Sequence, residues 1–331
     1  MPSAFKLTGR QLMKKMICIL ISLLSFIVNA HCTSGEDSLL VMFWNVENFF
    51  DHTDGGAGES DTEFSSYGSR HWTRKRFYVK CDAVAKAIFW IAGRYGRMPD
   101  LIGLAEIENR AVLERLLNHT LLRKHDYRIV HHDSGDRRGI DVAILYRDSS
   151  MDHLSTSVIT PEIGGKKMDT RDILHVGMSI SDSCRIDFIV NHHPSKYGGD
   201  EESSDRRKSA MTSLKNLCDS LGNESVIAMG DFNDVPDASS FEIIEGKLEN
   251  KGRYLHEKGE GTIRYEGRWQ LIDMFMVSPS LSLRTEMEIC PVPFLMVRER
   301  KHPGLKPFRT YSGPRYIGGV SDHCPVVLTV K

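Results

Sequence analysis

Five apolar runs along the chain are each bordered by side chains that can bind a metal or form hydrogen bonds. Runs of this length, rich in large and β-branched residues, predict buried strands. Because strands of one sheet system bring their ends together, we expect the bordering side chains to form one site. The runs are residues 40–44, 101–105, 186–190, 226–229 and 326–330, and the polar residues beside them are Asn45, Glu106, His192, Asp231, Asn233, Asp322 and His323.

Two longer segments have the apolar spacing of helices. Residues 75–94 carry apolar side chains on one face, and glycines followed by Pro99 end the segment. Residues 203–221 have the same spacing, and we expect Arg206-Arg207-Lys208 on its solvated face. Residues 51–68 are rich in Gly, Asp and Ser and predict a mobile loop with solvated acids. No repeat or long linker interrupts the pattern, so we predict one domain.

The N-terminal residues are typical of a targeting segment. Lys14 and Lys15 precede an apolar stretch over residues 17–28, and Val28-Asn29-Ala30 offers small residues for cleavage. This pattern predicts a secretory signal peptide over residues 1–30. The stretch is too short for a comfortable membrane span, which argues against an anchor.

Removal of the signal peptide would define the mature, exported chain. Met13 is an alternative start, since Lys14 follows it directly. We expect residues 31–37 to be a leader and residues 38–331 to be the domain, located in the periplasm or outside the cell. Lipidation of Cys32 is the alternative, although a histidine before the cysteine fits that signal poorly.

Charge and cysteine content limit the partners. The formal net charge of −1 becomes −5 once residues 1–30, with four basic and no acidic residues, are removed. An acidic chain is not a general nucleic-acid coat, so contact with nucleic acid requires local basic patches. Of seven cysteines, Cys18 lies in the signal peptide and the other six fit no zinc-binding spacing. Disulfides are permitted outside the cytoplasm, but buried free thiols are the expectation.

Taken in order, these motifs resemble the endonuclease/exonuclease/phosphatase superfamily. Gly230-Asp231-Phe232-Asn233 and Ser321-Asp322-His323 carry most of the resemblance, which covers roughly residues 38–331. The resemblance implies the deoxyribonuclease I-like fold. That fold is a four-layered α/β sandwich of two packed, mainly antiparallel or mixed sheets flanked by helices.

The resemblance also implies a divalent metal held by Glu106 and Asp322. Asn45 would lie beside the metal, as a ligand or as the group that orients the phosphate. Oxygen donors without a cysteine pair suit Mg²⁺ or Mn²⁺ rather than Zn²⁺. Glu47 could be a further ligand or face solvent, and Glu108 is expected to face solvent.

Catalytic roles follow from the same resemblance. Asp231 would orient or deprotonate the attacking water, Asn233 would donate to the phosphate, and His192 and His323 would contact other phosphate oxygens. Asp273 is a lone charge in an apolar strand and needs a partner. The resemblance pairs it with His323, which it would hold in one tautomer. Which histidine moves a proton is left open by the sequence.

Three further residues are candidate substrate contacts. Trp72 lies in a basic cluster, where it could stack on a substrate or could pack onto the core beside a helix that Thr73 caps. Arg171 precedes a predicted strand, at a position where members of the superfamily often keep an arginine. Arg309 belongs to the loop over residues 291–319, whose six Lys and Arg residues outnumber its one acid. Because this loop leads into the catalytic motif, we expect its charge to face the substrate.

The sequence therefore predicts an exported Mg²⁺-dependent phosphoesterase that hydrolyses phosphodiester bonds by in-line attack of water. A nuclease acting as a monomer is the leading hypothesis, with nucleic acid as the substrate. The alternative is a phosphatase or phosphodiesterase for a lipid headgroup, an inositol phosphate or another small phosphate ester. A secreted binding protein on an inactive scaffold is the third hypothesis, disfavoured because every mapped position is filled.

Overall fold

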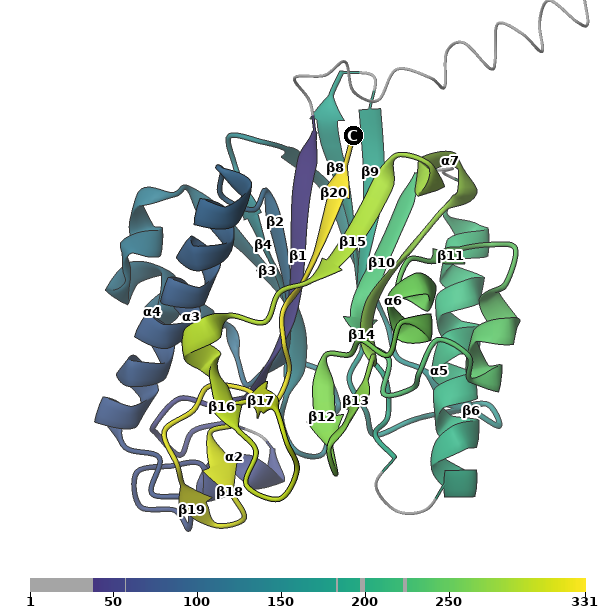
Figure 1. Ribbon diagram of the computed structural model, residues 1–331. Coiled ribbons are helices and arrows are strands. Elements are labelled where there is room, and N and C mark those ends of the chain that lie inside the picture. The colour runs from purple at the N-terminus through teal and green to yellow at the C-terminus, as the bar shows by residue number, and fades with distance from the viewer. Residues whose placement is uncertain (1–37, 57, 183, 197–199, 223–224) are drawn as a thin grey trace, which may run out of the picture.

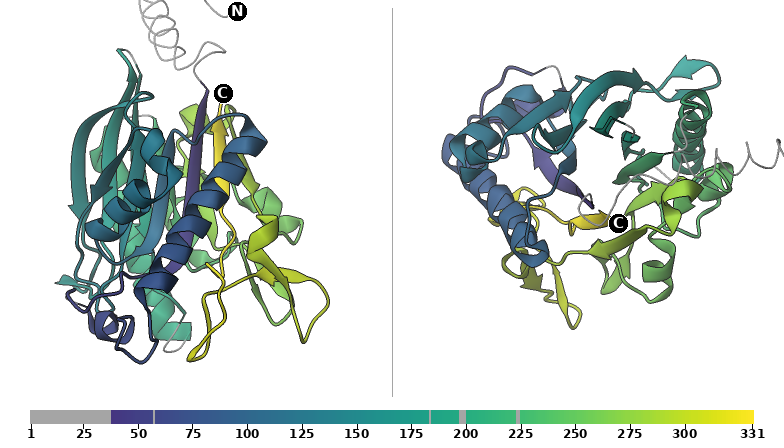
Figure 2. Two further views of the ribbon diagram at one scale, coloured as in Figure 1. Left: turned by 90° about the vertical axis from the view of Figure 1, so that its left-hand side faces the viewer. Right: turned by 90° about the horizontal axis from the view of Figure 1, so that it is seen from above.

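Two β-sheets pack face to face, and helices cover the outer face of each (Figures 1 and 2). This arrangement confirms the predicted four-layered α/β sandwich. The computed structural model describes residues 38–331 except 57, 183, 197–199 and 223–224.

The first sheet contains six strands, of which one neighbouring pair is parallel. Along its third strand, Val41 and Phe43 point between the sheets, whereas Met42 and Trp44 pack toward the helices outside. Because both faces are covered, the strand is a continuous apolar run without polar alternation. In spatial order the strands are β15 (Thr285–Ile289), β20 (Val326–Val330), β1 (Leu39–Phe49), β2 (Leu101–Ile107), β4 (Asp141–Arg147) and β3 (Tyr127–His131).

The second sheet repeats this plan. One neighbouring pair of its six strands is parallel, and the other neighbours are antiparallel. In spatial order the strands are β11 (Glu249–Asn250), β14 (Asp273–Val277), β10 (Val226–Asp231), β9 (Cys184–His192), β8 (Ile173–Ser181) and β5 (Asp152–Ile159).

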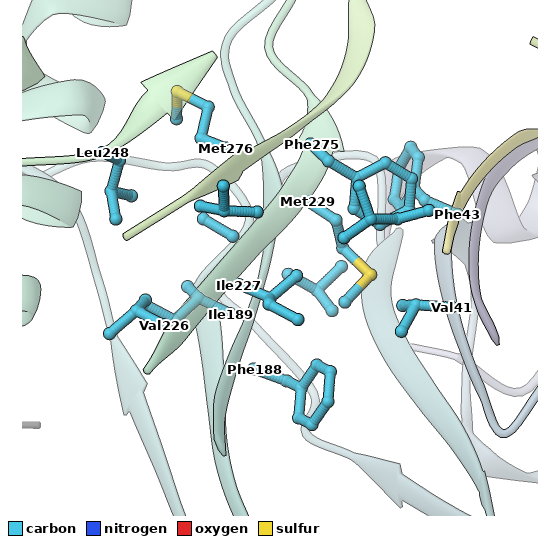
Figure 3. Packing of buried hydrophobic residues seen from close by; sticks show 14 of the residues in the cluster. Val41, Phe43, Phe188, Ile189, Val226, Ile227, Met229, Leu248, Phe275 and Met276 are labelled. Atoms are coloured by element: carbon cyan, nitrogen blue, oxygen red, sulfur yellow. The ribbon is translucent and has the colours of Figure 1, made fainter. Parts of the chain in front are cut away.

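The main core lies between the two sheets (Figure 3). Met229 of β10 points toward Val41 and Phe43 of β1 and is fully buried. Burial of a side chain of this size contributes about 1.5–3 kcal/mol. Gly103 makes the close approach possible, since a Cβ at that position would lie 2.7 Å from the sulfur of Met229. The absence of a side chain at Gly103 of β2 therefore allows the two sheets to pack this closely.

Three long helices form the outer layers: α3 (Arg74–Tyr95) and α4 (Arg110–His119) on the first sheet and α5 (Asp200–Ser220) on the second (Figure 1). The Thr73 hydroxyl accepts from Arg76 N, which confirms the predicted cap. The expectation for Arg207 is wrong. Its side chain is buried and pairs with Asp234 at 3.0 Å, because α5 turns this position toward the second sheet.

Short elements connect the layers, and most of the hairpins gather at one end of the sandwich (Figure 1). The short helices are α2 (Glu59–Glu63), η1 (Leu121–Lys124), η2 (Ser239–Ile244), α6 (Arg253–Glu257), α7 (Pro279–Ser282) and η3 (Pro293–Leu295). The short strands pair as β6 (Glu162–Ile163) with β7 (Lys166–Lys167), β12 (Ile263–Tyr265) with β13 (Arg268–Gln270), β16 (Met296–Arg298) with β17 (Leu305–Pro307), and β18 (Tyr311–Ser312) with β19 (Arg315–Tyr316).

Strand direction brings the ends that carry polar side chains to this same end of the sandwich. β1 and β2 run parallel to each other, and so do β9 and β10, so their carboxyl ends lie side by side. β14 and β20 are antiparallel to these strands, so their first residues lie there too. The polar borders of the apolar runs therefore meet at one edge of both sheets.

Two further findings concern membrane-spanning helices and the cysteines. No helix among the described residues is long and apolar enough to cross a membrane. Cys184 is disulfide-bonded, which corrects the expectation of a free thiol at that position. Four other cysteines are buried free thiols, as expected: Cys81, Cys218, Cys290 and Cys324. The predicted signal peptide and leader lie outside the described residues.

Candidate active site

Asn45 links two carboxylates at the centre of the site. Its amide nitrogen donates to Asp231 Oδ2 at 3.0 Å and to Glu106 Oε1 at 3.3 Å, although these two acids belong to different sheets. Its amide oxygen accepts from Glu47 N at 2.9 Å. The nitrogen and not the oxygen faces the carboxylates, so this orientation does not support Asn45 as a metal ligand. The geometry instead makes Asn45 a group that orients its two acidic neighbours.

The backbone around these residues adopts an uncommon conformation. Glu106, Glu47, Asn48 and Asn233 all have φ between 47° and 64°, in the left-handed region. Non-glycine residues rarely occupy this region, and they concentrate at functional sites. In this conformation the backbone N–H of Asn48 donates to Glu106 Oε2 at 2.7 Å and so holds the carboxylate in place.

His323 forms the predicted pair with Asp273. Its Nδ1 lies 2.8 Å from Asp273 Oδ2, and the Asp273 side chain is buried. Burial by itself would lower the pKa of His323. The hydrogen bond and charge of Asp273, together with the charges of Asp231 and Asp322, raise that pKa well above its usual 6.5. His323 is therefore an imidazolium at neutral pH.

His192 has the opposite electrostatic environment. Its Nε2 lies 3.6 Å from Asp231 Oδ2 and 4.0 Å from Glu106 Oε1. Burial, followed by the positive charges of Arg171 and Arg138, lowers the pKa of His192 well below 6.5. The site thus holds one charged and one neutral imidazole.

Asp231 lies between the two histidines. Burial and the nearby charge of Asp273 raise the pKa of Asp231 to about 7. Asn233, the other polar residue of this motif, donates its amide N–H to the carbonyl of His193 at 2.9 Å. A carboxylate with a pKa near 7 is suited to accept a proton at neutral pH.

Glu106 and Asp322 provide the oxygen donors that a hard cation prefers. Both are at least partly exposed toward the site, and both lie close enough to Arg309 to raise its pKa. Asp231, Asp273 and His323 also place ligand atoms within 4.8 Å of one another. Within that trio, His323 Nδ1 and Asp273 Oδ2 are already hydrogen-bonded to each other at 2.8 Å.

The candidate substrate contacts separate into three cases. Arg309 is half-exposed at the mouth of the site, where Nη2 lies 3.1 Å from Asp322 Oδ2. Arg171 is buried between Asp136, 3.0 Å away, and the His193 carbonyl, to which it donates at 2.6 Å. Trp72 is 1% exposed and its Nε1 donates to the Phe50 carbonyl, so the stacking role is wrong. Its packing alternative holds, because the rings of the terminal loop cover it.

The sequence reasoning missed a buried lysine below the site. Lys80 of α3 is fully buried, and its Nζ donates to the Glu47 carbonyl and to Thr310 Oγ1. The Glu47 carboxylate accepts from Thr310 N at 2.7 Å and faces Arg309 at 3.4 Å. Burial lowers the pKa of Lys80 and raises that of Glu47. A lysine on the apolar face of a predicted helix was the signal that could have revealed this network.

The prediction that Glu108 faces solvent is wrong, because its side chain is buried. It accepts from Asp51 N at 2.6 Å and is hydrogen-bonded to Asp61 of α2. Asp51 and Asp61 are buried too, so the loop over residues 51–68 does not present them to solvent as expected. Burial and Asp61 raise the pKa of Glu108 to about 9. Two neighbouring carboxyl groups therefore share a proton at neutral pH.

We expect Glu108→Gln to stabilise the protein at alkaline pH. The folded state keeps the proton between the ordinary pKa of 4.5 and the raised value of about 9, so stability falls as pH rises through this window. Glutamine donates the same hydrogen bond without titrating. The melting temperature should rise by about 2–8 °C at pH 8, for roughly 1–2 kcal/mol, and change little at pH 4.5. An equal shift at both pH values would contradict the shared proton, and Glu114→Gln on the exposed face of α4 is the control.

Known proteins share the sequence pattern and the fold of this chain. The Endonuclease/Exonuclease/phosphatase family profile matches residues 40–331. No curated protein sequence matches the chain. A family protein from Bacteroides thetaiotaomicron has a similar structure, with TM-score 0.57, 16% identity, and coverage of 88% of this chain and 97% of that one.

Two further solved structures share the fold. D. rerio TDP2 complexed with a single-strand DNA product has TM-score 0.54 and 14% identity, covering 89% of this chain and 99% of that one. The human Nocturnin catalytic domain with a bound sulfate has TM-score 0.53 and 14% identity, with coverage of 89% and 94%. With the profile match spanning the whole described domain, the chain belongs to the endonuclease/exonuclease/phosphatase family and is a metal-dependent hydrolase of phosphate esters.

Proposed function

We propose that the protein is an exported Mg²⁺-dependent nuclease that hydrolyses phosphodiester bonds by in-line attack of water. The observation that carries the proposal is the pair of histidines in opposite protonation states on either side of Asp231. A phosphoryl group entering between them would meet a positive charge on one side and a proton acceptor at the centre.

Each residue of the site has a role that follows from its environment. Asp231 accepts the proton that water loses as its oxygen attacks phosphorus, and Asn45 holds the Asp231 carboxylate in place. The imidazolium of His323, oriented by Asp273, donates to a phosphoryl oxygen and stabilises its charge. His192 contacts another phosphate oxygen. Because His192 is neutral, it adds no positive charge beside Asp231 that would disfavour the transfer of a proton from water to Asp231.

Glu106 and Asp322 would hold the metal. When bound, Mg²⁺ or Mn²⁺ neutralises the phosphoryl oxygens and the leaving alkoxide. Arg309 pairs with Asp322 and Glu47 while exposing part of its guanidinium, so it can also contact a substrate phosphate. Arg171 acts differently, because it fixes the backbone after His192 through the His193 carbonyl.

Nucleic acid is the substrate that these features support best. The positively charged terminal loop borders the site through Arg309 and Thr310, and the similar TDP2 structure holds single-strand DNA product. Release of product from DNA, RNA, sphingomyelin and inositol phosphates, measured side by side with and without Mg²⁺, tests the proposal. Turnover confined to sphingomyelin or inositol phosphates would reject the nuclease and favour the alternative class.

We propose export on the signal pattern of residues 1–30, and the disulfide at Cys184 supports an oxidising location. We expect mass spectrometry of the exported protein to give an N-terminus near His31. An intact N-terminus would contradict cleavage, and a diacylglyceryl mass on Cys32 would instead identify a lipoprotein. We expect a monomer, which sedimentation of the purified protein would check.

A further inference from the structure

A second cluster of side chains that could hold a metal ion lies outside the candidate active site, where β3 ends and β4 begins. His131 is the last residue of β3, Asp141 is the first residue of β4, and Asp133 lies in the loop between them. Each residue offers one ligand atom, and the three atoms all lie within 4.8 Å of one another. The two antiparallel strands therefore bring an imidazole and two carboxylates to a single point.

The His131 imidazole points into this cluster without a hydrogen bond. Its side chain is 2% exposed, and its Nε2 lies 3.2 Å from Asp141 Oδ2. Even at this distance from the carboxylate, Nε2 has no hydrogen-bond partner among the described residues. A buried polar atom in this state is costly unless a further group satisfies it.

Asp141 is arranged to leave one oxygen for such a group. Its Oδ1 accepts from both the backbone N–H and the hydroxyl of Ser134, at 2.9 and 2.5 Å. Oδ2 remains on the side of His131. Ligand atoms of a tetrahedral Zn²⁺, each about 2.0–2.1 Å from the metal, lie roughly 3.3 Å apart, which matches the distance between Nε2 and Oδ2.

We propose that His131, Asp133 and Asp141 form a Zn²⁺ site that closes the loop between β3 and β4. An imidazole with two carboxylates suits Zn²⁺, whereas Mg²⁺ prefers oxygen ligands only. Asp133 Oδ1 lies 3.9 Å from the other ring nitrogen of His131, Nδ1. Its side chain is 84% exposed, so it would have to turn to reach a metal bound at Nε2, and water can complete the tetrahedron. This site is independent of the nuclease proposal.

The loop that the metal would close borders the active site. It carries Asp136, which pairs with Arg171, and Arg138, whose charge lowers the pKa of His192. Joining the two ends of the loop through one ion would hold both residues in place. The role of the zinc is therefore structural, and its removal should loosen the loop without removing a catalytic group.

Zinc retention by the full chain tests the proposal. All variants carry Glu106→Gln, which removes a ligand of the catalytic metal, and are loaded with Zn²⁺ and passed through gel filtration in excess Mg²⁺. Elemental analysis should then find about one Zn²⁺ per chain, and Zn²⁺ should raise the melting temperature. Adding His131→Gln should abolish both effects, and adding Asp133→Asn should weaken binding at least tenfold, since even outer-shell changes cost about 10–100-fold.

His132→Gln is the matched control, because this adjacent imidazole is half-exposed and faces Asp172 instead. It should retain the zinc. Asp133→Asn decides the matter if His131→Gln fails to fold, since an exposed asparagine does not disturb the core. Absence of retained zinc in the Glu106→Gln protein, or equal retention by the Asp133→Asn variant, would overturn the proposal.

Discussion

Replacement of His323 by alanine is expected to lower turnover on a phosphodiester by about 10²–10³-fold, the usual cost of removing one donor that stabilises charge in the transition state. The main chain at this position is held independently of the imidazole. Trp44 Nε1 donates to the His323 carbonyl at 3.0 Å, and the Ser321 hydroxyl accepts from His323 N at 3.0 Å. The loss should therefore come from the missing imidazolium and not from movement of the loop.

Asp273→Asn tests whether the two residues act as one unit. Asparagine keeps the shape of the side chain but loses the charge that raises the pKa of His323, so the rate should fall more than substrate binding does. The double variant should be little slower than His323→Ala, because residues that act together are non-additive. It should also be more stable than His323→Ala, which leaves a buried carboxylate unpaired.

Turnover and melting temperature of these three variants decide the point. If the two rate losses multiply, His323 and Asp273 act independently, and the proposal that Asp273 orients His323 for catalysis is wrong. If His323→Ala melts far below the wild type while the double variant does not, the rates are compared at a temperature where all variants are folded.

Glu106→Gln is expected to lower turnover by at least about 10³-fold, because the metal would lose a charged ligand worth several kcal/mol to the transition state. The fold should survive. Glutamine can still accept from Asn48 N through its one carbonyl oxygen, and its shape is unchanged. Circular dichroism and thermal unfolding should match the wild type, and the Mg²⁺ concentration for half-maximal activity should rise.

Glu286→Gln is a suitable comparison, since this exposed glutamate on β15 forms an ion pair with Lys331 at the surface. It should leave turnover unchanged. Near wild-type activity of Glu106→Gln at saturating Mg²⁺ would remove Glu106 from the metal site. Loss of activity together with loss of cooperative unfolding would instead assign Glu106 a role in the fold.

The order of strands and their polar ends could be predicted from the sequence. Apolar runs such as residues 226–229 and 326–330 are local signals, and both form strands of the core. Helix boundaries could also be predicted from local signals, because Thr73 caps the start of α3 and Gly96 ends it. Motif order then supplied the identities of Glu106, Asp231 and His323 before their distances were known.

Burial of individual polar residues could not be predicted in the same way. Arg207 and Glu108 have sequence neighbours typical of exposed positions, and Lys80 is a charged residue on an apolar helix face. Each is nevertheless buried against a partner distant in the sequence. The partner of Lys80, for example, is Thr310 of the terminal loop. Trp72 was ambiguous for the same reason, since the loop that covers it lies more than two hundred residues away.

The sequence by itself determined the fold and the candidate residues at the strand ends, because strand periodicity and motif order are encoded locally. Only the tertiary structure decided how those residues are charged. His192 and His323 are the same side chain at two strand ends, but one faces Arg171 and Arg138 while the other faces Asp273. A protonation state depends on burial and on charges brought close in space, and these arise only when both sheets have packed together.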